Sequence, residues 1–474
     1  MRTTESPARR TAGYTLLVLF LINFLNFFDR VIPSIVLEPV RKEFMLSDTM
    51  LGVITTAFTL VYAVAGIPLG RLADKYRRTR ILSTGVFIWS LTTAACGFAW
   101  NFVSFFLFRV GVGVGEASCA PAANSMIGDL YPAEKRGRAL GIFMLGLPLG
   151  AVAAFAGAGQ LAHHFGWRAT FLFAAVPGLL VAALAWFLKE PARGAQERYS
   201  LDARAAVDQP FRRIIATPTV WWIILSGVVY NVAAYGMNTF LPALLIRYHG
   251  LNVAQAGGIS AVVLGLTGLI GLTVGGWVAD ALHRRFARGR LLLGAVALLV
   301  AGPLIWFGLN QPIGRVVSLT GLLCAGWLLF FLYYVTVYAS LQDVVEPRLR
   351  ATAMAVYFFF QYVLGAAFGS TVAGMLSDHF AQQAMAAASA VTMSDAFRAS
   401  GLQVSLSYLI PSAVFISGLS LLGAAFSFVR DAEKASIAPS AGSSWHMPRH
   451  TQQGVVSPGR PQHSDIPADT VKKD

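Results

Sequence analysis

Charged residues are scarce in this 474-residue chain, since Asp, Glu, Lys and Arg make up 13% of it, whereas soluble domains carry about 25%. Its three cysteines, Cys96, Cys119 and Cys324, are scattered through apolar stretches, which excludes a disulfide framework and a cysteine metal site. A net charge of +14 does not indicate nucleic-acid binding, because the basic residues form short runs between long apolar segments. No Walker motif is present. We therefore expect no metal, no cofactor and no nucleic-acid partner.

Long apolar runs dominate the chain. Twelve of them are long enough to cross a bilayer core of about 30 Å, which takes about 20 residues of helix. The predicted spans are 14–37, 49–70, 81–99, 102–127, 139–162, 169–188, 219–246, 255–281, 291–309, 315–341, 351–377 and 403–429. Because the runs are continuous rather than alternating, they predict an all-α membrane protein and not a strand barrel.

Lys and Arg are distributed unequally between the two sides. Of the 37, 29 fall in the terminal tails and in alternate loops, and 6 fall in the other loops. This bias predicts a multi-pass plasma (inner) membrane protein with both termini in the cytoplasm. The longest inner loop divides the spans six and six. The predicted parts are a tail over 1–13, a six-helix bundle over 14–188, a linker over 189–218, a second bundle over 219–429 and a disordered tail over 430–474.

The two halves repeat a loop motif. Gly70, Ala73 and Asp74 precede a basic run after the second predicted span, and Gly276, Ala279 and Asp280 do so after the eighth. Two copies at equivalent places indicate an internal repeat of six helices, an arrangement found in many secondary transporters.

Four ionisable residues lie inside predicted spans, where charge is costly and usually functional. They are Asp29, Arg30, Arg109 and Glu116. Counted from the span ends at 1.5 Å per residue, Asp29 and Arg109 lie at a similar depth, about 10–12 Å below the outer surface. We therefore predict that Asp29 pairs with Arg109, while Glu116 titrates in a drier place nearer the midplane. The alternative is that the four residues only tie the two helices together.

The equivalent helices of the second half carry no buried charge. They offer amide and aromatic side chains that, with Asn26 of the first span, are candidates for the wall of a substrate cavity. These candidates are Asn231, Asn238, Tyr334, Tyr357 and Gln361. Each could equally serve ordinary packing between helices. A charged wall facing an aromatic one suits an amphipathic organic anion better than a sugar.

The repeated loop motif resembles that of the major facilitator superfamily over about residues 14–430. The resemblance implies twelve helices in two six-helix bundles that alternate between two open states. It also implies a gating role for Gly70, Asp74, Arg78 and Asp280, which hold the cytoplasmic side shut in the outward-facing state. The first copy has Arg77 where a Gly is common.

Further stretches are similar to the Spinster-like branch of that family. They include Leu25 to Arg30, Leu46 to Gly52 and Arg109 to Ala117. In that branch the acid and Arg of the first helix, with the Arg and Glu of the fourth, form the proton-coupling and head-group site, and they match the four charged residues above. The implied function is secondary transport of a lysolipid-like or other phosphate or carboxylate anion, coupled to protons, by a monomer.

Three other interpretations stay open. The fourth-helix stretch is also similar to the anion:cation symporter branch, which imports sugar acids and aromatic carboxylates, although Ser118 to Pro121 depart from its usual Phe-Pro. A membrane-embedded lipid enzyme would need a nucleophile or metal constellation, and a sensor would need a larger cytoplasmic domain. We therefore expect a transporter and not an enzyme.

Overall fold

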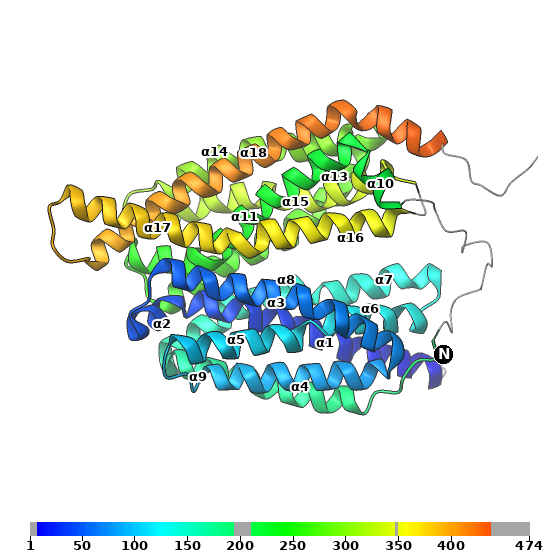
Figure 1. Ribbon diagram of the computed structural model, residues 1–474, viewed down its shortest axis with the longest axis horizontal. Coiled ribbons are helices and arrows are strands. Elements are labelled where there is room, and N and C mark those ends of the chain that lie inside the picture. The colour runs from blue at the N-terminus through cyan, green and yellow to red at the C-terminus, as the bar shows by residue number, and fades with distance from the viewer. Residues whose placement is uncertain (1–6, 194–209, 347–348, 438–474) are drawn as a thin grey trace, which may run out of the picture. The chain divides into compact units, whose positions relative to one another are not determined.

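The computed structural model of the protein describes residues 7–193, 210–346 and 349–437, and within these ranges the chain is helical and contains no strand. The N-terminal half, up to residue 193, comprises α1 (Pro7–Ile35), α2 (Leu37–Phe44), α3 (Asp48–Lys75), α4 (Arg78–Cys96), α5 (Phe102–Glu116), α6 (Cys119–Leu130), α7 (Ala133–Met144), α8 (Gly146–Ala153), η1 (Ala154–Ala158) and α9 (Gly159–Trp186). The C-terminal half, from residue 210, comprises α10 (Pro210–Ile215), α11 (Pro218–Arg247), α12 (Val253–Ser260), η3 (Ala261–Leu266), α13 (Thr267–Arg285), α14 (Gly289–Leu309), α15 (Val316–Asp343), α16 (Arg350–Phe360), η5 (Gln361–Ala366), α17 (Ala367–Ala387) and α18 (Asp395–Ile437). Figure 1 shows each half as a group of roughly parallel helices.

Within the described ranges, ten helices are long and apolar enough to cross a membrane. The two further predicted spans are also helical. The spans 139–162 and 169–188 fall within one continuous run, Lys135–Trp186, which is interrupted where Gly166 adopts a φ of 82°. The span 81–99 corresponds to α4, whose many Ser and Thr residues make it less apolar. The all-α membrane fold predicted from the sequence is thus confirmed.

Some predicted boundaries differ from the structure. Helix α1 begins at Pro7, inside the predicted tail, and α18 continues to Ile437, past the predicted start of the C-terminal tail. The outer segment 378–402 consists of the end of α17, a short turn and the start of α18. Most of the predicted linker and of the C-terminal tail, residues 194–209 and 438–474, lies outside the described residues.

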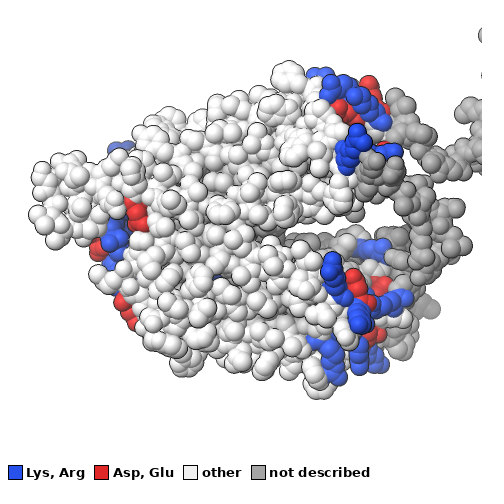
Figure 2. Space-filling model, viewed as in Figure 1, with Lys and Arg blue, Asp and Glu red and all other residues white. Residues whose placement is uncertain are grey.

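Charged side chains gather at the two ends of the helices. Figure 2 shows most of the Lys and Arg at the end that carries α7, α10 and the end of α18, which we call the basic end. A broad uncharged surface separates it from the opposite end, as expected for side chains that face lipid. At the basic end the surface is hollowed between the two halves.

The halves touch most closely at the opposite end, which we call the closed end. There the start of α3 lies against α17 with backbone in contact with backbone. A Cβ added at Gly52 would lie 2.6 Å from the Cα of Thr371, and one added at Gly374 would lie 2.6 Å from the carbonyl carbon of Asp48. Glycine at both positions is what lets the two helices approach this closely.

Candidate functional site

The four intramembrane charges come together through helices α1 and α5. Asp29 and Arg30 lie in the second half of α1, while Arg109 and Glu116 lie two turns apart on α5. Glu116 is the last residue of α5, and the turn at Ala117 and Ser118 separates this helix from α6. Both turn residues keep right-handed helical backbone angles, and Phe102–Leu130 forms one candidate span, as the sequence predicts for 102–127.

Arg30 and Glu116 form the ion pair of the site. The Nε–H of Arg30 donates to Oε2 of Glu116 over 2.7 Å. The Glu116 side chain is fully buried, whereas that of Arg30 retains 15% exposure. Arg30 is therefore the member of the pair that a solute can approach.

The predicted pairing of Asp29 with Arg109 is wrong for this conformation. Both side chains are buried and lie within electrostatic range of each other, but they make no ion pair within the described part of the chain. The depth estimate compared backbone positions alone. Neighbouring residues on a helix point about 100° apart, so Arg30 reaches Glu116 in the direction that Asp29 does not face.

Two aromatic residues of α3 hold the arginines in place. The guanidinium carbon of Arg30 lies 4.2 Å from the ring centre of Tyr62 and 5.6 Å from that of Phe58, and the guanidinium carbon of Arg109 lies 5.1 Å from the same Phe58 ring. The Phe58 ring therefore carries a cation–π contact with each arginine. Gly113 makes room for it, because a Cβ there would lie 3.3 Å from the ring. Phe58 and Tyr62 were not predicted from the sequence, although their spacing of four places them on one helix face.

The site has more hydrogen-bonding capacity than the protein itself uses. Buried polar atoms without a hydrogen-bond partner in the described structure come from all four charged residues and from Asn26. They are Asn26 Nδ2, Asp29 Oδ1, Arg30 Nη2, Arg109 Nε and Nη1, and Glu116 Oε1. Most buried polar atoms in proteins are paired, so such a cluster is suited to water or to a polar ligand.

Tyrosines of the C-terminal half face this cluster. Tyr235 of α11 and Tyr362 of η5 lie within electrostatic range of Arg30, and Tyr334 of α15 lies within range of both of these tyrosines. All three are half-buried. Of these, Tyr334 belongs to the predicted cavity wall and Tyr362 is an addition from the structure.

Three of the other predicted wall residues form hydrogen bonds within the C-terminal half, and a fourth, Gln361, does not use its side-chain oxygen. Asn231 and Asn238 each donate their amide to a carbonyl one turn earlier on α11. The hydroxyl of Tyr357 lies 3.0 Å from that of Tyr333, and the side chain is fully buried. Gln361 is buried with its Oε1 unpaired within the described ranges. Their part in a substrate cavity stays a prediction.

The predicted gating residues lie at the basic end. The guanidinium of Arg78 bonds the carboxylates of Asp129 and Glu190, both within the N-terminal half. Burial alone would raise the pKa of Glu190, but hydrogen bonds from Thr79 and Arg78 hold this pKa below its ordinary value. Asp74 is exposed and has no ion-pair partner among the residues that the structure describes.

The C-terminal half repeats this arrangement. The guanidinium of Arg290 bonds Asp280 at 2.8 Å and Asp343 at 3.1 Å. In the N-terminal half, Gly70 lies next to Pro121 of α6, since a Cβ added at Gly70 would lie 3.8 Å from the proline ring. At the basic end, the ion pairs of Arg78 and of Arg290 therefore stay within their own halves. No described ion pair joins Asp74 or Arg78 to the other half.

Comparisons with known proteins agree with this architecture. The family model described as Major Facilitator Superfamily matches residues 19–370. The chain belongs to this superfamily. It is therefore a multi-pass membrane transporter and not an enzyme, as the sequence predicts.

Several relatives refine the assignment. The chain is 32% identical to an MFS-type efflux pump of Mycolicibacterium smegmatis, over 76% of this chain and 83% of the pump. It is 29% identical to the hexuronate transporter of Bacillus subtilis, over 70% of this chain and 80% of that protein. A solved bacterial homolog of the human lysosomal transporter Spinster, inward-facing and unoccupied, matches with a TM-score of 0.82 and 29% identity, over 90% of this chain and 99% of that one. The predicted Spinster-like character is confirmed.

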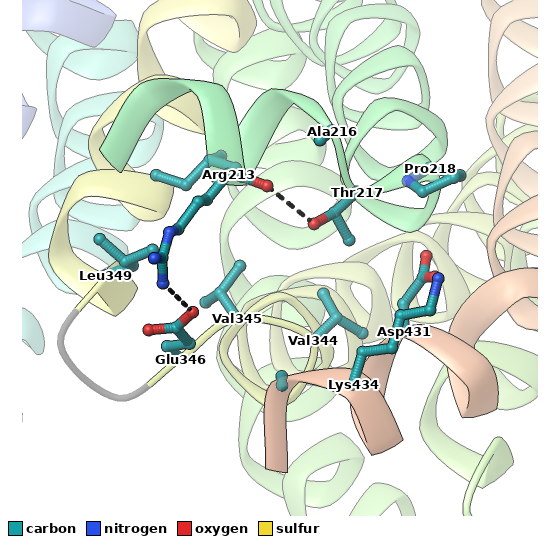
Figure 3. A pocket seen from close by; sticks show the side chains of 12 residues that line it. Arg213, Ala216, Thr217, Pro218, Val344, Val345, Glu346, Leu349, Asp431 and Lys434 are labelled. Atoms are coloured by element: carbon teal, nitrogen blue, oxygen red, sulfur yellow. Dashed lines mark hydrogen bonds and ion pairs between the residues drawn. The ribbon is translucent and has the colours of Figure 1, made fainter. Parts of the chain in front are cut away.

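A separate recess lies at the basic end of this transporter. Figure 3 shows it between α10, the start of α11 and the end of α18. Three of its charged side chains are already engaged, since Arg213 bonds Glu346 at 2.8 Å and Asp431 accepts from the backbone N–H of Thr219. The recess therefore does not compete with the four-charge cluster as the substrate site.

Proposed function

We propose that this protein is a proton-coupled secondary transporter that moves an organic anion with apolar bulk across the membrane by alternating access. The observation that carries the proposal is the Arg30–Glu116 ion pair, which stands beside Arg109 and Asp29 and opposite half-buried tyrosines. Two arginines with unpaired N–H groups, together with two carboxylates, supply both an anion site and a proton site.

The arginines account for the anionic head group. Arg30 and Arg109 keep N–H donors free in the described structure, while their contacts with the Phe58 ring fix their planes. A guanidinium binds phosphate or carboxylate through two parallel hydrogen bonds. Tyr235 and Tyr334 then offer an aromatic surface to the apolar part of the substrate.

Glu116 accounts for the proton. An anion that binds Arg30 competes with the carboxylate of Glu116 for the same guanidinium. A fully buried carboxylate that loses its counter-charge is neutralised by taking up a proton. Anion and proton are therefore bound together, and the transporter works as a symporter.

The orientation follows from charge. With the basic end in the cytoplasm, as the positive-inside rule requires, the protein lies in the plasma (inner) membrane with both termini inside. The hollow at the basic end then opens to the cytoplasm, which is the inward-facing state. We propose that Gly70, Asp74, Arg78 and Asp280 close this side in the outward-facing state.

The test is anion flux in proteoliposomes with and without an inwardly directed proton gradient, in which the outside solution is more acidic than the lumen. We expect the gradient to drive uptake of a short-chain lysophosphatidic acid by the wild type, and to have no effect on the Glu116→Gln variant, which holds no exchangeable proton. Glu346→Gln, which alters a surface ion pair with Arg213, serves as the control and keeps its gradient dependence. An unchanged response of Glu116→Gln to the gradient would remove this residue from coupling.

A second candidate substrate class is sugar acids and aromatic carboxylates. The resemblance to the hexuronate transporter of Bacillus subtilis favours it. Competition in the same flux assay separates the two classes. Gradient-driven uptake of labelled glucuronate that benzoate inhibits and lysophosphatidic acid does not would favour the small carboxylates.

A further inference from the structure

Six charged residues meet at the closed end, and they come from both halves. Glu38 and Arg41 belong to α2 and Asp48 begins α3. The C-terminal half contributes Arg247 at the end of α11, Asp378 of α17 and Asp395 at the start of α18. We call Glu38, Arg41, Asp48, Arg247, Asp378 and Asp395 the closed-end network.

Arg247 is the centre of the network. Its Nε–H bonds the carboxylate of Glu38, and its Nη1 donates to Oδ2 of Asp48 over 2.8 Å. Ser377 donates to the same Asp48 oxygen over 2.6 Å. The side chains of Arg247, Glu38 and Asp48 are all at most 3% exposed. One arginine of the C-terminal half therefore neutralises two buried acids of the N-terminal half.

Arg41 makes the reciprocal connection. Its Nη2 lies 2.8 Å from Oε1 of Glu38 and 2.9 Å from Oδ1 of Asp395. An arginine of the N-terminal half thus bonds an acid of the C-terminal half. In one cross-link the C-terminal half supplies the cation, and in the other the N-terminal half supplies it. A displacement of one half against the other breaks both.

The C-terminal half also caps a helix of the N-terminal half. The carboxylate of Asp378 accepts hydrogen bonds from the backbone N–H of Asp48 at 3.0 Å, from that of Thr49 at 2.9 Å, and from the Thr49 hydroxyl at 2.6 Å. The first N–H groups of a helix have no partner within the helix and are normally capped by a nearby side chain. The local cap, Ser47, accepts from the backbone N–H of Met50. Asp378 of α17 adds the acceptors for Asp48 and Thr49, and these hydrogen bonds are lost when the halves separate.

This arrangement has a direct consequence for alternating access. Buried ion pairs add little to stability compared with apolar packing, but removing one partner leaves an uncompensated buried charge, which is strongly unfavourable. That penalty applies only while the closed end is shut, because an open end returns the charges to water. The network therefore favours the shut state only when it is complete.

We propose that the closed-end network is a latch that sets the ratio of the two conformations of the transporter, with Arg247 as the residue on which the shut state depends. The latch shares no residue with the four-charge cluster, so its residues can be substituted without altering Glu116 or the two arginines. Any influence that neutralises one member of the network shifts the protein toward the state that is open at this end.

The test follows the accessibility of a cysteine placed in the interface. Thr371 bonds Thr56 across the halves at 2.7 Å, so Thr371→Cys, in a background without the three native cysteines, reports opening. We expect Arg247→Gln to raise its labelling rate by a membrane-impermeant maleimide at least about tenfold. The variant Arg247→Gln with Asp48→Asn restores the charge balance, and we expect it to label more slowly than Arg247→Gln alone.

Two controls separate a latch from a loosened fold. Glu43→Gln breaks a half-exposed ion pair with Arg168 inside the N-terminal half, and we expect it to leave the labelling rate unchanged. The native Cys96 is fully buried within the N-terminal half, so a protein that retains only this cysteine reports unfolding. Fast labelling of Cys96 in the Arg247→Gln background would overturn the latch, as would unchanged labelling of Thr371→Cys.

Asp378→Asn is the second variant, in case Arg247→Gln does not accumulate in the membrane. It keeps the size of the cap and removes its charge. We expect a smaller increase in labelling of Thr371→Cys than Arg247→Gln would give. No increase with Asp378→Asn would contradict the latch.

Discussion

At the scale of single residues, the proposed anion recognition depends on how two arginines are held. Arg30 and Arg109 carry like charge, yet both lie against one Phe58 ring. The ring interacts with each cation through its π face and is in contact with both guanidinium groups. The planes of the guanidinium groups are thereby fixed before an anion arrives, which reduces the entropy lost on binding.

Arg30→Lys tests this positioning. A lysine keeps the positive charge but loses the planar fork and most of the contact with Tyr62. We expect the apparent affinity for the transported anion to fall at least about tenfold, with a smaller effect on the maximal rate. Concentration dependence of flux in proteoliposomes measures both quantities.

Arg168→Lys is the matched control for that variant. Arg168 also combines an ion pair, with Glu43, and a cation–π contact, at 4.2 Å from the Trp167 ring, but it is exposed at the closed end. We expect its substitution to leave anion affinity within about twofold of the wild type. Equal losses in both variants would show that Arg30 acts on stability rather than on binding.

Sequence reasoning identified the four charged residues because charge within an apolar span is rare. It did not find their pairing, since Asp29 and Arg30 are neighbours in sequence and only side-chain direction decides which of them reaches Glu116. It also did not find Phe58 and Tyr62, because aromatic residues are common in membrane helices and nothing in the sequence distinguishes these two from lipid-facing ones.

At the scale of helices, α3 connects the closed end with the charge cluster. Its first residues carry the cap from Asp378, Gly52 lies against α17, and Phe58 and Tyr62 follow within the next turns. A movement of this helix away from α17 therefore also moves the aromatic contacts of both arginines. Opening of the closed end and rearrangement of the site are coupled through one rigid element.

Gly52→Ala tests the close approach of α3 and α17. The added methyl group would lie 2.6 Å from the Cα of Thr371, so the helices must separate while the closed end is shut. We expect faster labelling of the Thr371→Cys reporter and a lower apparent melting temperature. Gly66→Ala, on the same helix with open space around its Cβ, is the control. We expect it to leave the labelling rate unchanged and not to lower the melting temperature.

A result in which Gly52→Ala and Gly66→Ala behave alike would contradict the backbone contact. Propensity alone favours Ala over Gly in a helix by about 1 kcal/mol, so both variants gain equally on that count. The difference between them therefore isolates the steric effect.

Glycines of α5 let this helix pack closely against its neighbours. Gly115 lies where a Cβ would be 2.7 Å from Trp89, and Gly113 accommodates Phe58. Small residues commonly allow such close approach between membrane helices.

At the scale of the whole molecule, sequence reasoning was most successful. Apolar run lengths gave the helices, and the repeated Gly-x-x-Ala-Asp motif gave the family, which the match over residues 19–370 confirms. The closed-end network was not predicted, because its members lie more than 150 residues apart in some pairs, such as Glu38 and Arg247. Only the fold brings them together.

The two charged regions divide the work of transport. The closed-end network joins the halves at one end, and we propose that the four-charge cluster in the membrane binds anion and proton. At the basic end, Arg78 and Arg290 each bond carboxylates of their own half, which leaves this end free to open. The inward-facing conformation is thus stabilised by the contacts of the closed-end network, and the outward-facing conformation needs other contacts in their place.

The central claim is that Glu116 takes up a proton from solution when an anion binds Arg30. Titration calorimetry of the purified transporter with lysophosphatidic acid, in two buffers of different ionisation enthalpy near neutral pH, counts the protons exchanged per anion bound. We predict that the wild type takes up about one proton more than the Glu116→Gln variant. Equal proton exchange in the two proteins, with the anion bound by both, would contradict the claim.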